Sequence, residues 1–222
     1  SFWEKLSFGT KWNVRDILRH KSRSAMTLVG VVGCMMLLVG GLGMKDTMAT
    51  FMKMLDEDIN HYATKVNFTE TAENEKIKEF AESVDGDWMA STGISYEGEA
   101  ISLEIYQAKN QKIRFLNQEN EVMELSDDGV YLCLRLADTA EIGDTIEFSP
   151  YGSEETYSVR VAGFFRSLMT ECIIMTDEYA ESKDISYHIG TIFTDESIDE
   201  IEKNSMIASK QDKDTIMETY DS

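Results

Sequence analysis

Residues Ala25–Met44 read AMTLVGVVGCMMLLVGGLGM, a stretch without a charged residue or a proline. A helix of about 20 residues rises roughly 30 Å, which matches the hydrocarbon thickness of a bilayer. A helix also satisfies every backbone N–H and C=O group within the segment, as lipid requires. The stretch therefore predicts a membrane-spanning helix. The alternatives are the core helix of a water-soluble protein, which is usually shorter and apolar on one face, and a signal peptide, whose apolar run is shorter and starts earlier.

Charged residues are distributed unevenly around this helix. Residues 1–24 contain six of the 21 Lys and Arg residues but two of the 41 Asp and Glu residues. Residues 45–222 contain the other 15 and 39, so the net charge is +4 before the helix and −24 after it. The positive-inside rule then predicts a cytosolic N-terminus and an extracytoplasmic segment 45–222. This acidic segment argues against nucleic acid as a partner, because it has too few cations to neutralise a run of phosphates.

Apolar residues continue on both sides of the membrane helix. Before it, aromatic and aliphatic side chains alternate with basic ones, which predicts that residues 1–24 form an amphipathic helix in the headgroup plane; a detached cytosolic helix is the alternative. After it, apolar residues recur at steps of three and four without Gly or Pro, which predicts a helical stalk over residues 45–64. The residues of this stripe are Met44, Met48, Phe51, Met52, Leu55, Ile59 and Tyr62. We expect the Met-rich face to pack on a partner helix.

The pattern changes from residue 65 onward. Alternating and short apolar runs predict strands over residues 65–69, 100–108, 113–116, 130–134, 144–148, 157–165, 172–175, 189–193 and 205–208. Helices are expected over residues 72–84, 136–140 and 210–220, and after Thr176 and Thr194, which are potential N-caps. The predicted fold class is therefore α+β: a transmembrane helix extended as a stalk, followed by a mixed α+β extracytoplasmic domain over residues 65–222.

Motifs for catalysis and cofactor binding are missing from the sequence. The three histidines form no HExxH motif, and neither a phosphate-binding GxxxxGK[ST] loop nor a GxSxG elbow occurs. The acidic clusters Asp56–Asp58, Asp195-Glu196 and Asp199-Glu200 lack the spacing of a calcium loop. We therefore predict no catalytic, cofactor-binding or metal-binding residues and no cofactor. Cys133 and Cys172 lie in apolar runs, which favours buried free thiols over the alternative of one disulfide.

Two groups of motifs resemble the FtsX-like permease family, which includes MacB-type transporters. The first covers the approach to the membrane: Trp12-Asn13-x-Arg15, then Lys21-Ser22-Arg23-Ser24, then the Gly-rich run from Thr27 to Gly43. The second resembles the extracytoplasmic domain of these permeases: Gly129–Phe148 with Ile142-Gly143-Asp144-Thr145-Ile146, then Val159–Phe164 and Ile173–Thr176. Together they extend over about half of the chain, and their order and position make the match specific.

The resemblance implies the membrane subunit of an ABC transporter with a MacB-like periplasmic core domain. Its implied partners are the lipid bilayer, a cytosolic ABC ATPase that hydrolyses ATP, and a second permease unit or homodimer partner. It also implies that ATP-driven motion is transmitted outward, with a pivot at Trp12–Arg23 and a lever at Met48–Tyr62, and that further membrane helices follow residues 210–222. The alternatives are a single-pass sensor or adhesion ectodomain without transport, and a membrane-tethered enzyme, for which the sequence has no catalytic cluster.

Overall fold

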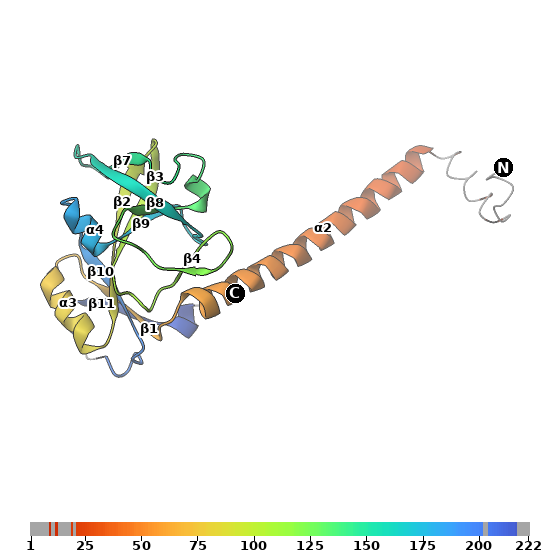
Figure 1. Ribbon diagram of the computed structural model, residues 1–222. Coiled ribbons are helices and arrows are strands. Elements are labelled where there is room, and N and C mark those ends of the chain that lie inside the picture. Colours follow the sequence, from red (N-terminus) through yellow and green to blue (C-terminus); the bar gives the residue numbers. More distant parts are fainter. Residues whose placement is uncertain (1–8, 10–11, 13–18, 20, 202–203, 217–222) are drawn as a thin grey trace. The chain divides into compact units, whose positions relative to one another are not determined.

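The computed structural model describes residues 9, 12, 19, 21–201 and 204–216 of the chain (Figure 1). The chain divides after Thr50 into two units. The described part of the first unit is mainly the helix α2 (Lys21–Lys53), which has no buried residue and ends a few residues inside the second unit. Within the described residues, the helical stretch Lys21–Ile59 alone is long and apolar enough to cross a membrane, with a mean hydropathy of 2.2 over an 18-residue window.

The second unit, called the head below, begins at Phe51. Its helices are the π-helix η1 (Met54–Ile59), α3 (Asn74–Ser83), the 3-10 helix η2 (Leu134–Leu136) and α4 (Asp177–Ser182). Its strands are β1 (Thr64–Phe68), β2 (Asp87–Tyr96), β3 (Glu99–Tyr106), β4 (Phe115–Leu116), β5 (Val122–Met123), β6 (Val130–Cys133), β7 (Thr145–Pro150), β8 (Tyr157–Phe165), β9 (Cys172–Thr176), β10 (Ile189–Thr194) and β11 (Ile207–Asp212).

Nine of these strands form one sheet, in the order β11-β1-β10-β2-β3-β9-β6-β8-β7. A further pairing of β2 with β7 closes six of the strands, from β2 to β7, into a ring. One edge of β2 is divided between two partners, because Asp87–Ala90 pairs with β10 while Ile94 and Ser95 pair with β7. The strands β10, β1 and β11 therefore extend from the ring as a three-stranded wing (Figure 1).

Two hydrophobic cores match this division. The larger core contains the inward-facing residues of the ring, among them Ile94, Leu103 and Val161, each at most 1% exposed. The smaller core lies between α3 and one face of the wing, where Ile77 packs with Val66 and Ile192. In α3 the buried residues Ile77 and Ala81 are four positions apart, which is the spacing of one helix face. The helix α3 therefore covers one face of the wing and does not contact the other face.

The α+β fold class predicted from the sequence is confirmed, and most predicted strands are present with slightly different ends. The sequence pattern does not predict β2, because the run Ser91-Thr92-Gly93 interrupts its apolar alternation. The helix predicted after Thr176 is present as α4, and the Thr176 hydroxyl accepts the Tyr179 N–H as its N-cap.

The predicted helical stalk over residues 45–64 ends too late. The helix stops at Ile59, and Asn60 has extended backbone angles of φ −90° and ψ 101°. Tyr62 lies beyond the end of the helix and is apolar because it belongs to the core of the head. The centroid of its ring lies 4.8 Å from that of Phe193. Leu55 is buried within the head and Ile59 packs against its larger core, so this end of the stripe contacts other residues of the chain.

One other helix prediction is wrong, and another begins too early. Thr194 starts no helix, although its hydroxyl accepts the Glu196 N–H at 3.2 Å as an N-cap would; it also donates to the Val84 carbonyl at 2.5 Å, and residues 195–201 form turns and bends. The last helix, expected over residues 210–220, starts later: residues 210–212 belong to β11 and pair with β1, and residues 213–216 are helical. The predicted amphipathic segment 1–24 lies mostly outside the described residues, as do residues 217–220.

Candidate functional site

The site of interest, called the junction below, lies within the head, where η1 ends and the sheet begins. The Asn60 N–H donates to the Leu55 carbonyl at 2.9 Å and closes η1. Asn60 then forms an antiparallel bridge with Ile113, flanked by a hydrogen bond from His61 N–H to the Lys112 carbonyl (2.7 Å). On the other side of the bridge, the Arg114 N–H donates to the Ile59 carbonyl at 2.9 Å. The end of η1 is thus connected to the rest of the head by paired backbone.

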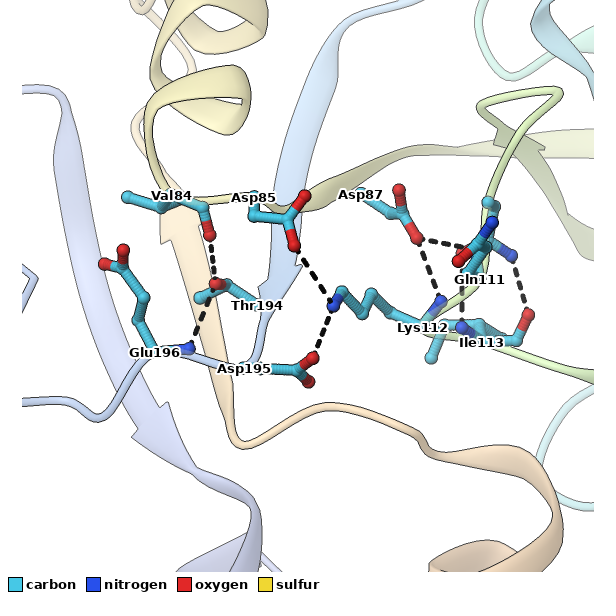
Figure 2. Close-up of polar contacts among 10 residues, drawn as sticks. Val84, Asp85, Asp87, Gln111, Lys112, Ile113, Thr194, Asp195 and Glu196 are labelled. Atoms are coloured by element: carbon cyan, nitrogen blue, oxygen red, sulfur yellow. Dashed lines mark hydrogen bonds and ion pairs between the residues drawn. The ribbon is translucent and has the colours of Figure 1, made fainter.

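Lys112 extends this junction into the sheet, as Figure 2 shows. Its side chain is only 13% exposed, and its ammonium lies 2.5 Å from a carboxylate oxygen of Asp195, after β10, and 4.0 Å from one of Asp85, before β2. Its backbone N–H donates to the Asp87 carboxylate at 2.9 Å, which also accepts the Gln111 N–H at 2.6 Å. One residue therefore links the end of η1 to the start of β2 and the end of β10.

Lys213 binds the other side of η1. It follows β11, and its side chain is 18% exposed. Its ammonium donates to the carbonyls of Asp56 and Asn60, each at 3.0 Å, and lies 2.7 Å from the Asp56 carboxylate. These are the carbonyl groups that a helix leaves unpaired at its C-terminus, where a cation is also favourable for the helix dipole. The backbone N–H of Lys213 donates to the Ala63 carbonyl at 2.9 Å, so the residue after β11 lies beside the start of β1.

The acidic clusters seen in the sequence have structural partners here. Asp56 pairs with Lys213, and Asp195 pairs with Lys112. Glu200 accepts hydrogen bonds from the backbone N–H and hydroxyl of Ser197, which lower the pKa of its carboxyl group. Within the described residues, no three His, Cys, Asp or Glu side chains are grouped so that they could hold a metal ion.

Both cysteines of the head are buried free thiols, as the sequence favoured. Burial raises the pKa of Cys172 to about 12, with a smaller contribution from the charge of Glu104. A thiol with so high a pKa remains protonated at neutral pH and is a poor nucleophile. Neither a redox nor a nucleophilic role follows from these residues.

Next to the junction lies a cavity of about 490 Å³. Its floor is the face of the sheet opposite α3, and its walls are η1 and two segments, residues 113–115 and 165–170. Lys65 and Glu104 face this cavity from β1 and β3. Sequence reasoning singled out the apolar residues Leu55, Ile59 and Tyr62 of this region as part of a stripe, but not Lys65, Lys112 or Glu104, because an isolated Lys or Glu among apolar residues has no distinguishing pattern.

The chain matches no protein-family model and no curated protein. Among solved structures, it is similar to the extracellular domain of the noncanonic ABC-type transporter YknZ from Gram-positive bacteria. The match has a TM-score of 0.42 and 13% sequence identity, and it covers 63% of this chain and 86% of that domain. A likeness at this level supports no conclusion about the relationship or the function of this chain.

Proposed function

We propose that this chain is part of the membrane subunit of an ABC transporter of the FtsX-like, MacB type. In this proposal the N-terminus is cytosolic, α2 spans the bilayer, and the head is extracytoplasmic. A separate cytosolic ATPase hydrolyses ATP, and a second permease unit or a second copy of the chain completes the complex. The chain transmits the motion of the ATPase to the head, for export or extraction of a substrate. The support comes from the family resemblance of the sequence and from the geometry of the junction.

The observation that carries the proposal is the helical backbone from Lys21 to Ile59, whose last turn is bound within the head. A rigid element passes on motion only where its end is firmly attached. At the junction, backbone pairing to Ile113 and the contacts of Lys112 and Lys213 attach η1 to β2, β10 and β11. A displacement of η1 would therefore move the wing and the ring together.

The proposal is tested by breaking the junction in the full-length protein, reconstituted with its ATPase in nanodiscs. Replacing Ile59-Asn60 by Gly-Gly removes the apolar contact of Ile59 and loosens the backbone at the end of η1. The matched control places Gly-Gly at Glu154-Glu155, in the exposed turn between β7 and β8. The measurement is limited proteolysis of the head with and without ATP and vanadate, alongside ATP hydrolysis.

We expect the wild type and the control to show an ATP-dependent change in the cleavage pattern of the head. The junction variant should lose this change while it still hydrolyses ATP and inserts into the membrane. A junction variant that retains the change would contradict motion transmission. If the full-length protein, purified from its native membrane, brings no Walker-type ATPase with it, the sensor or adhesion alternative replaces the transporter.

A further inference from the structure

The cavity beside the junction has the size and lining of a small-molecule site. Its volume of about 490 Å³ falls within the range of roughly 300–1,000 Å³ that is usual for ligand pockets. Aromatic side chains from five different parts of the chain line it, namely Tyr62, Tyr106, Phe115, Phe165 and Phe193. Most of its floor consists of β-strands, which hold their side chains more rigidly than loops do.

Lys65 faces this cavity without a partner of its own. Its side chain is partly buried, and burial lowers the pKa of the ammonium, against the opposing effect of the Glu104 charge. Among the residues that the structure describes, no hydrogen bond or ion pair reaches this ammonium. A partly buried ammonium without a partner loses hydration that nothing replaces, so it destabilises the unoccupied head.

Glu104 faces the same cavity from β3. The Tyr106 hydroxyl donates to one oxygen of its carboxylate at 2.8 Å, which fixes the orientation of the group. Its second oxygen has no hydrogen-bond donor within the described part of the chain. Lys65 and Glu104 do not form an ion pair, so their charged atoms are more than 4.0 Å apart. Two strands, β10 and β2, lie between β1 and β3 in the sheet, and Phe193 and Met89 face the cavity from them.

We propose that this cavity binds a small zwitterion of the α-amino acid class with an apolar side chain. Its carboxylate pairs with Lys65, its ammonium pairs with the free oxygen of Glu104, and its side chain contacts the aromatic walls. The gap between Lys65 and Glu104 is too wide for direct contact, and a molecule with both charges on neighbouring groups can bridge it. An amphiphile with a single charge would leave one of the two residues unpaired, at a cost in free energy.

A third polar group supports the carboxylate end. Arg166 lines the cavity, and its Nε is buried without a hydrogen-bond partner among the described residues. Its Nη2 donates to the Gln118 carbonyl at 3.1 Å, which holds the guanidinium in place. Arg114 also lines the cavity, so its charged residues are three cations and one carboxylate, in a head that is otherwise strongly acidic.

The test is isothermal titration of the full-length protein in nanodiscs with L-phenylalanine and L-leucine. Two analogues each lack one charge: N-acetyl-L-phenylalanine has no ammonium, and L-phenylalaninamide has no carboxylate. We expect L-phenylalanine to bind at least about tenfold more tightly than either analogue, the ratio that one lost charged contact produces. Equal affinity for all three compounds, or no binding up to about 10 mM, would overturn the proposal.

Two variants assign the contacts. Lys65→Met should remove the preference for L-phenylalanine over L-phenylalaninamide, and Glu104→Gln should remove the preference over N-acetyl-L-phenylalanine. Lys76→Met, which breaks an exposed ion pair with Glu73, is the control and should leave every affinity unchanged.

If both site variants keep both preferences, the ligand binds elsewhere and the proposal fails. Tight binding of decanoate, with no binding of the amino acids, would identify an anionic amphiphile instead and also refute it. The motion-transmission experiment does not depend on any of these outcomes.

Discussion

At Glu104, burial opposes ionisation. The pKa of this carboxyl group is raised above its ordinary value of 4.5 by burial, although the hydrogen bond from Tyr106 and the charge of Lys65 act in the other direction. The folded state therefore binds this proton more tightly than the unfolded state does. The contribution of the Glu104 carboxyl group to the free energy of unfolding is most favourable below about pH 4.5. This contribution is lost as the pH rises through the folded-state pKa.

Glu104→Gln should remove this pH dependence. The amide keeps an oxygen that accepts the Tyr106 hydroxyl, but it does not titrate. We expect the free energy of unfolding of the variant to fall less steeply than that of the wild type as the pH rises above about 4.5, measured by urea unfolding at a series of pH values. Glu99→Gln, at an exposed position on the same strand, should follow the wild-type curve. A steeper fall in the Glu104 variant would show that the burial effect has the opposite sign.

Individual polar residues were the least predictable feature of the sequence. Asp56 and Asp195 belong to clusters that looked like solvated acidic surface, yet each pairs with a mostly buried lysine. Lys112 and Lys213 find their partners across 83 and 157 positions of the chain, respectively. Such contacts depend on which strands become neighbours, and local spacing contains no information about that. The buried state of Cys133 and Cys172 was predictable, because each sits in a continuous apolar run.

At the scale of elements, Lys213 stabilises the end of η1. Lys213→Met removes the ion pair to Asp56 and both hydrogen bonds to the helix carbonyls. We expect the amides of residues 55–61 to exchange with deuterium about tenfold faster or more, because a charged hydrogen bond contributes roughly 1.5–3 kcal/mol. Hydrogen–deuterium exchange with mass spectrometry measures this directly.

The control for this prediction lies on the same helical stretch. Lys53 forms an ion pair with Glu57 at 3.6 Å, but both side chains are mostly exposed. Exposed pairs of this kind contribute little, so Lys53→Met should leave exchange at residues 55–61 nearly unchanged. Equal acceleration in both variants would mean that loss of positive charge, and not loss of the specific contacts of Lys213, loosens η1.

Elements with a clear apolar period were predicted well from the sequence. The residues of β3 and β8 alternate regularly between buried and more exposed positions, and α3 has a single apolar face. The strand β2 was missed because its ten residues serve two different environments, the wing at one end and the ring at the other. The helix expected after Thr194 is absent although the Thr194 hydroxyl accepts the Glu196 N–H, so a potential N-cap alone does not start a helix. For β2, tertiary contacts override the local signal.

For the whole molecule, composition predicts the orientation in the membrane, and cysteine labelling tests it. In a Cys34→Ala background, the buried Cys133 and Cys172 should not react with a membrane-impermeant maleimide. We expect Ser153→Cys, at an exposed turn of the head, to be labelled in intact cells, and Ser22→Cys to be labelled only after permeabilisation. The reverse pattern would place the acidic head in the cytosol and contradict the charge rule.

Closure of the ring could not be predicted from the sequence, because the pairing of β2 with β7 joins segments that have no common motif.

The pairing of β1 with β11 has a mechanical consequence. Thr64 lies opposite Asp212, so the start of β1 and the end of β11 lie at the same end of the pair. A force that pulls Thr64 and Asp212 apart would break the hydrogen bonds between β1 and β11 one after another from this end, and not all at once. Lys213 follows β11 at this end, so its ion pair with Asp56 would be among the first contacts to bear the force.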